Sequence, residues 1–80
     1  MEHKQYNTVK LKEIKKQFYR NDMSVAEREP RVGDIAAIVE VYENPSLGYE
    51  LECVDKNGIT QWLATFSPDD AEFELVNEYT

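Results

Sequence analysis

The clearest structural signal in this chain lies at residues 49–58, which read YELECVDKNG. Apolar and acidic side chains alternate from Tyr49 to Cys53, and a period of two marks a strand with one buried face. Asn57-Gly58 follows, and this pair tolerates the positive φ angles that a tight hairpin turn requires. The stretch therefore predicts a strand, a hairpin turn and a return strand over residues 59–66.

The segments on either side of this hairpin also favour strands. Residues 35–42 are rich in β-branched side chains, and their apolar positions fall on both faces, which suits a central strand or one bent by a bulge near Ala36-Ala37. Residues 67–70, Ser-Pro-Asp-Asp, form a turn in which the Ser67 side chain can bond a backbone N–H. A last short strand is predicted over residues 73–76.

Residues 8–14, TVKLKEI, fit two structures. Period-two alternation puts Val9 and Leu11 on one face of a strand. Helical spacing instead aligns Leu11, Ile14 and Phe18. We favour the strand, because Thr8 and Val9 are β-branched.

Residues 15–33 lack either periodicity and contain turn and breaker residues such as Pro30 and Gly33. Pro30 disfavours helix at Glu29, so one short helical turn over residues 24–28 would have to end there. The segment is predicted to be a long loop, a place where function concentrates. The apolar side chains expected to attach it to the barrel are those of Phe18, Tyr19, Met23 and Val25.

Together these segments predict an all-β fold, a small five-stranded SH3-like barrel whose long first loop has room for one short helix. A closed sheet also hides strand edges, which a small all-β domain must protect. We expect a single domain over residues 8–78, preceded by a flexible N-terminus at residues 1–7. Its core is expected to include Val39, Leu51 and Leu63.

Residues 31–42, RVGDIAAIVEVY, resemble the Gly-Asp-hydrophobic opening of a central strand in small SH3-like barrels. With residues 49–53, 57–60 and 63–66, the chain resembles an uncharacterised bacterial family, domain of unknown function forty-nine twenty-six. The resemblance covers roughly residues 8–76, although residues 15–31 form a longer first loop than is usual there. It implies a small accessory protein, in some cases the non-enzymatic member of a two-gene pair with a toxin-like partner, and it supplies no catalytic residues.

The composition excludes several classes of site and of protein. The chain has 80 residues and a single cysteine, so no internal disulfide can form, and no Cys/His spacing suits a metal. No phosphate-binding glycine loop is present, and no cofactor is expected. The first residues, MEHKQ, lack the apolar stretch of a secretory signal, and no run of about 18 apolar residues could span a membrane. We expect a soluble, cytoplasmic protein.

The charges divide the chain into two unlike parts. Residues 1–31 carry eight basic and five acidic side chains, a net charge of +3, whereas residues 32–80 carry one and eleven, a net of −10. The overall net charge of −7 argues against general nucleic-acid binding and favours either plain solubility or a basic protein partner. The alternative is a nucleic-acid-associated barrel that uses the basic cluster Lys10, Lys12, Lys15, Lys16 and Arg20.

No group of residues predicts catalysis. His3 is the only histidine and lies near the terminus, without a second group to orient it. Cys53 alternates into the predicted core, where a thiol behaves as a small hydrophobe. The carboxylates of Asp69-Asp70 and of Glu72 and Glu74 point to different sides or lie on an exposed face, so we expect them to be solvated. The chain is therefore not expected to be an enzyme.

Trp62 is open to two interpretations. It either fills the core, or it lies on the surface as an aromatic anchor of the kind that dominates binding sites. SH3-like barrels often bind through aromatic side chains that line a groove, but a Pro-rich ligand needs an organised pair of tyrosines, which Tyr42 and Tyr49 would supply only by chance. We expect a non-enzymatic protein-interaction module, an accessory or neutralising (antitoxin- or immunity-like) member of a gene pair with a basic or toxin-like partner. Its predicted partner-binding residues are Trp62, Tyr42, Tyr49, Glu50, Glu52, Phe18 and Tyr19.

Overall fold

The computed structural model describes residues 4–19, 23 and 25–77, and these contain strands but no helix. The five long strands are β1 (Thr8–Ile14), β3 (Ile35–Tyr42), β4 (Gly48–Val54), β5 (Thr60–Phe66) and β6 (Ala71–Asn77). A two-residue strand, β2 (Val25–Ala26), lies in the long first loop. The all-β prediction is confirmed. Residues 8–14 form a strand, and no helix occurs in the described part of the first loop.

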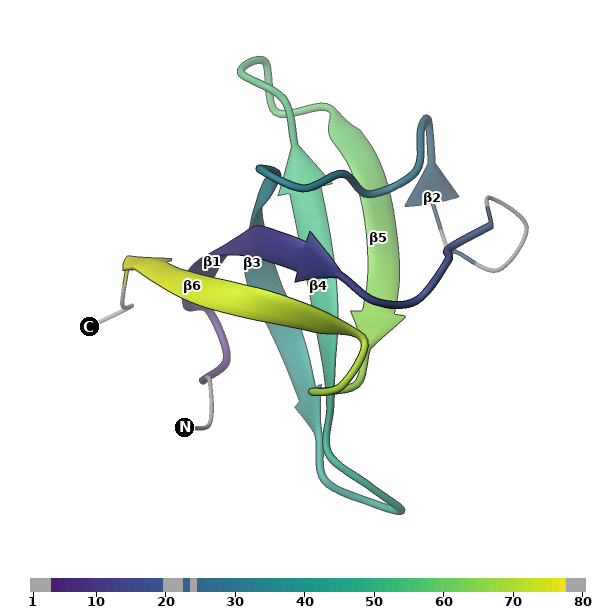
Figure 1. Ribbon diagram of the computed structural model, residues 1–80. Coiled ribbons are helices and arrows are strands. Elements are labelled where there is room, and N and C mark those ends of the chain that lie inside the picture. The colour runs from purple at the N-terminus through teal and green to yellow at the C-terminus, as the bar shows by residue number, and fades with distance from the viewer. Residues whose placement is uncertain (1–3, 20–22, 24, 78–80) are drawn as a thin grey trace.

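All strand pairs are antiparallel, in the order β2-β5-β4-β3-β1-β6. In Figure 1, β1 and β6 cross in front of the layer formed by β3, β4 and β5, so the single sheet folds back on itself. This strand order, with a long loop after β1 and a tight hairpin between β4 and β5, is that of a small SH3-like barrel, as expected.

The core lies between these two crossing layers. β1 contributes Val9 and Leu11, which are fully buried, and β5 contributes Trp62 and Phe66, which are also fully buried. Phe66 is the centre of an aromatic group: its ring centroid lies 4.4 Å from that of Phe18 and 5.8 Å from those of Trp62 and Phe73. The remaining buried apolar residues are Ala36, Ile38, Tyr49, Leu51, Cys53, Ala64 and Ala71.

The expected core is correct at Leu51 and wrong at Val39 and Leu63, which are only half-buried. On β5 the buried residues are Trp62, Ala64 and Phe66, so the alternation of that strand turns Leu63 outward. On β3 the bulge lies between Ile38 and Glu40, not near Ala36-Ala37. Val39 is the extra residue of this bulge, so its side chain does not belong to the inward-facing set of β3.

The end of the N-terminal segment is bound to the barrel. The Tyr6 amide donates to the Ile38 carbonyl at 2.6 Å, and the Ile38 amide donates to the Asn7 carbonyl at 2.9 Å. Asn7 is itself buried. Tyr6 and Asn7, predicted to belong to a flexible terminus, therefore extend the β1–β3 pairing. Residues 1–3 lie outside the described part.

The two predicted turns form with acidic side chains as caps. Gly58 takes a φ of +81°, and the Asp55 carboxylate accepts hydrogen bonds from the amides of Asn57 and Ile59. In the turn before β6, the Asp70 carboxylate accepts from the Ser67 amide, the reverse of the expected role for Ser67. An aspartate that accepts main-chain N–H groups is the usual way to close such turns.

Candidate partner-binding surface

The long first loop is attached to the barrel at separate points, and the first of these is Phe18. Its ring is 9% exposed and packs on Phe66, while Nζ of Lys16 lies 5.3 Å from the ring centroid. Further along the loop, β2 pairs with β5, and the Glu27 amide donates to the Gln61 carbonyl at 2.7 Å. The loop is thus an ordered part of the fold where the structure describes it.

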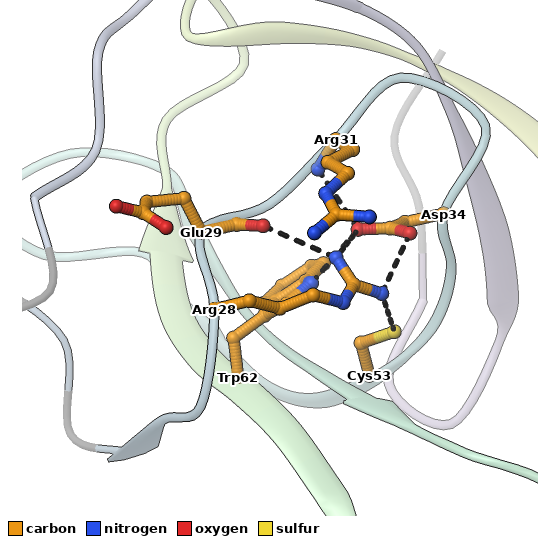
Figure 2. A network of polar contacts seen from close by, with 6 residues as sticks. All are labelled: Arg28, Glu29, Arg31, Asp34, Cys53 and Trp62. Atoms are coloured by element: carbon orange, nitrogen blue, oxygen red, sulfur yellow. Dashed lines mark hydrogen bonds and ion pairs between the residues drawn. The ribbon is translucent and has the colours of Figure 1, made fainter.

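The last attachment is a polar network centred on Asp34 (Figure 2). Oδ2 of Asp34 accepts from Nη1 of Arg28 at 2.8 Å and from Nε1 of Trp62 at 2.9 Å. Oδ1 accepts from Nη2 of Arg28 at 2.9 Å, so the guanidinium binds the carboxylate with two parallel hydrogen bonds. The Arg31 amide adds a further bond to Oδ2 at 2.8 Å.

Local sequence explains how Asp34 reaches this position. Gly33 has a φ of +96°, which only glycine adopts without strain, and the chain turns there so that the Asp34 amide donates to the Arg31 carbonyl. On the other side, Arg28 lies two residues after β2, and its amide donates to the Gln61 carbonyl of β5 at 3.4 Å, which holds this part of the loop against the barrel. The indole N–H of a buried tryptophan needs an acceptor, and this requirement was the signal in the sequence that could have indicated Asp34.

The electrostatics of the network are those of a structural contact. Burial alone would raise the pKa of Asp34, but hydrogen bonds from Arg28, the Arg31 amide and Trp62, with the charge of Arg28, lower it below its usual value. The pKa of the Cys53 thiol is raised, first by burial and then by the charge of Asp34, although Nη2 of Arg28 lies 3.9 Å from its sulfur. An ionised, fully bonded carboxylate beside a protonated thiol supplies neither a base nor a nucleophile.

The structure corrects part of the predicted partner-binding surface. Trp62 is completely buried, so of its two interpretations the core is right and the surface anchor is wrong. Tyr49 is 2% exposed, so its ring is not presented to a partner, and Phe18 is 9% exposed and packs mainly in the core, although it lines the same groove as Tyr19. Tyr49 also cannot pair with Tyr42 to line a groove for a Pro-rich ligand, since Tyr49 points inward and Tyr42 points outward.

Three of the predicted residues do share a surface. Tyr42, Glu50 and Glu52 lie on the outer face of β3 and β4, where the Tyr42 hydroxyl donates to Oε1 of Glu50 at 2.8 Å. This hydrogen bond is the main cause of a raised Tyr42 pKa. The seventh predicted residue, Tyr19, is exposed but lies on the first loop, where it lines a separate groove of about 480 Å³ with Arg31 and Val32.

The structure adds Glu40, which the sequence did not indicate. The bulge on β3 makes Glu40 the direct cross-strand partner of Glu50. Two like charges directly opposite each other destabilise an antiparallel pair. We call Tyr42, Glu40, Glu50 and Glu52 the acidic face. No cation forms an ion pair with it within the described residues, and residues 32–55 contain no lysine or arginine.

The basic cluster, in contrast, is partly matched within the molecule. Nζ of Lys12 lies 4.0 Å from Oε1 of Glu74, and Nζ of Lys16 lies 3.9 Å from Oδ2 of Asp70. Both pairs join β1 and the start of the loop to the acidic C-terminal part of the chain. Arg20 lies outside the described residues.

In comparisons with known proteins, no protein family, no curated protein and no solved structure matches the chain. The described residues contain no group of three or more histidine, cysteine or acidic side chains placed to hold a metal ion. The same residues include no helix of the length and apolarity needed to cross a membrane.

Proposed function

We propose that this chain is a non-enzymatic protein-interaction module whose acidic face binds a basic partner protein. The observation that carries the proposal is the opposition of Glu40 and Glu50 across β3 and β4, with Glu52 on the same face. Repulsion between these carboxylates costs free energy in the free protein. A cationic partner would remove that cost on binding, so the face is better suited to a complex than to solvent.

Tyr42 supplies the aromatic contact that such a face needs. Its side chain is 42% exposed, and its hydroxyl is held by Glu50, so the ring is presented in one orientation. A tyrosine of this kind contributes large contact area at a low entropy cost. The surrounding carboxylates would mainly raise the rate of encounter with a basic partner.

The biological role that we propose is that of an accessory or neutralising member of a gene pair. It depends on the resemblance of roughly residues 8–76 to the uncharacterised bacterial family, and the proposal includes that the chain belongs to this family. A neutralising protein acts by covering a surface of its partner, which requires a stable binding face and no catalytic group.

The proposal is tested with Glu40→Gln, which removes one charge of the opposed pair. Tagged protein is used to capture partners from the native host, and the captured amounts are compared with those of Glu72→Gln on β6. This variant is a matched control, because Glu72 also lies directly opposite a glutamate, Glu13 of β1, but outside the acidic face. We expect Glu40→Gln to reduce capture of the specific partner about tenfold, which corresponds to about 1.4 kcal/mol, and Glu72→Gln to leave it unchanged.

Thermal melts of the same variant provide an internal control. Because the change relieves repulsion, Glu40→Gln should stabilise the free protein by about 0.2–1 kcal/mol. If Glu40→Gln melts at or above the wild-type temperature, its weaker capture of the partner cannot be attributed to unfolding. Equal reduction by both variants would indicate a general charge effect, and no reduction by either would contradict the proposal.

The alternative is a nucleic-acid-associated barrel that uses the basic N-terminal segment. The ion pairs of Lys12 with Glu74 and of Lys16 with Asp70 weigh against it, because those charges already have acidic neighbours. Titration of a fluorescent single-stranded oligonucleotide against salt separates the two functions. Binding at low salt that weakens steeply as salt rises would favour the alternative.

A further inference from the structure

A small hollow on the outer face of the sheet lies beside the acidic face and has its own chemistry. It has a volume of about 280 Å³, below the range of about 300–1,000 Å³ that is typical of sites for drug-sized ligands. Its size suits a single side chain better than a small-molecule substrate. We call it the Glu52 hollow, and its lining residues are Thr8, Ile35, Ala36, Ala37, Glu52 and Val54.

The sequence explains why the sheet is hollowed at this point. Ala37 lies on the central strand, with Thr8 of β1 as its cross-strand partner on one side and Glu52 of β4 on the other. A methyl group between two longer side chains leaves space above it. Ile35 and Val54, which are 50% and 47% exposed, form aliphatic walls. Exposed large aliphatic side chains around one cavity are typical of an interaction site.

Glu52 is the only charged residue among those that line the hollow. Its Oε2 accepts a hydrogen bond from the Thr60 hydroxyl at 2.7 Å, which orients the carboxylate. Lys10 of β1 has Ile35 as its cross-strand partner, and no ion pair joins Lys10 or any other described cation to Glu52. The carboxylate is thus held in place without a cationic partner.

We infer that the Glu52 hollow receives one lysine or arginine side chain of the basic partner. The aliphatic stem would pack between Ile35 and Val54, and the charged head would bind the Glu52 carboxylate. Long basic side chains bury their stems against apolar surface in this way while their charge stays at a polar group. An apolar side chain would leave Glu52 covered and unpaired, which is costly, and an acidic one would be repelled.

This inference rests on the proposed function, because it assigns one contact of the basic partner to a defined place. The hollow and the acidic face share Glu52 but differ in their other residues: the hollow is built by Ala37, Ile35 and Val54, whereas the carrying observation for the proposed function is the Glu40 and Glu50 pair. Ala37→Leu, which leaves every charge in place, is therefore the variant that separates the two. The two can therefore fail separately.

The test is an NMR titration of ¹⁵N-labelled protein with Nα-acetyl-lysine-N-methylamide, and with the arginine and norleucine analogues as separate probes. We expect the lysine or arginine probe to shift the amide signals of Ala37, Glu52 and Val54 in a saturable way, with a Kd in the millimolar range. Norleucine has a similar stem without the charge, and it should shift them far less. Equal shifts with norleucine would mean an unspecific apolar patch and would overturn the inference.

Two variants of different kinds keep the test independent of folding. Glu52→Gln removes the charge and should weaken probe binding about tenfold, whereas Ala37→Leu fills the hollow and should abolish it. Glu72→Gln on β6 is the matched control and should leave the titration unchanged. Unaltered binding in both Glu52→Gln and Ala37→Leu, with native spectra, would overturn the inference.

Capture of the partner separates this inference from the proposed function. If Glu40→Gln reduces capture but Glu52→Gln and Ala37→Leu do not, the partner binds the acidic face without using the hollow, and only the inference fails. If the probes saturate the hollow but Glu40→Gln leaves capture unchanged, the proposed function fails while the cation-binding hollow remains.

Discussion

Asp34 joins the end of the long first loop, through Arg28 and the Arg31 amide, to the indole of Trp62 on β5, which is distant in sequence. These hydrogen bonds are charge-assisted, because their acceptor is an ionised carboxylate. Their common acceptor makes them interdependent: loss of the carboxylate would leave the buried indole N–H without its acceptor and the guanidinium with only the Glu29 carbonyl and the Cys53 sulfur. The side chain of Asp34 is 13% exposed, so water could replace it only in part.

Asp34→Asn should therefore destabilise the protein by about 1–3 kcal/mol at neutral pH. The folded-state pKa of Asp34 is lowered, so its contribution is fully present above the unfolded pKa of about 3.9 and is lost as the pH falls through the lower folded value. Urea unfolding of wild type and variant should show a constant difference above about pH 5 that shrinks in stronger acid.

Asp69→Asn, in the exposed turn before β6, is the control for a general effect of removing one acidic charge. It should change the free energy of unfolding by less than about 0.5 kcal/mol at both pH 7 and pH 2. A cost of Asp34→Asn that is as large at pH 2 as at pH 7 would show that the ionised carboxylate is not what stabilises the network.

At the level of elements, the first loop behaves as part of the barrel and not as a free connection. Its start packs through Phe18 on Phe66, and its middle adds β2 to the edge of the sheet beside β5. The short pairing of β2 contributes few main-chain bonds. The apolar contact of Phe18 and the Asp34 network are therefore expected to provide most of the free energy that holds the loop.

Phe18→Ala should cost about 3–5 kcal/mol of unfolding free energy, because it opens a cavity beside Phe66. Tyr19→Ala, one residue further and 57% exposed, should change stability by no more than about 0.5 kcal/mol. Hydrogen exchange at the Glu27 amide, which bonds to Gln61 of β5, should be faster in Phe18→Ala. Equal costs for the two variants would mean that the loop is not anchored by the Phe18 ring.

At the level of the whole molecule, the net charge of −7 is only partly balanced inside the fold. Within the described residues, ion pairs join Lys12 to Glu74 of β6, Lys16 to Asp70 in the turn before β6, and Arg28 to Asp34, while the acidic face has no cationic partner. Like charge spread over a small domain opposes compaction, and salt screens it within about 10 Å.

Raising the salt concentration from about 10 mM to about 200 mM should therefore increase the melting temperature of the free protein, by about 2–4 °C for a gain of about 0.5 kcal/mol. Melting should also be nearly independent of pH between about 6 and 8, because the shifts of Asp34, Tyr42 and Cys53 all move their pKa values away from that range. A fall in melting temperature with added salt would mean that the internal ion pairs outweigh the repulsion.

The sequence determined the elements of this fold because their signals are local. Alternation predicted β1 and β4, and Asn57-Gly58 predicted the hairpin, since a strand period and a turn conformation depend only on neighbouring residues. The same signals placed Leu51 inside. They also placed Tyr42, Glu50 and Glu52 on a candidate surface.

Only the tertiary structure decided which face of β3 and β5 is buried and which residues meet across the sheet. Both strands have apolar residues on both faces, so alternation could not place Trp62, and Val39 and Leu63 were assigned to the wrong side. The bulge after Ile38 set Glu40 against Glu50, and the fold brought the indole of Trp62 to Asp34. These contacts depend on the register between distant segments, which no short stretch of sequence contains.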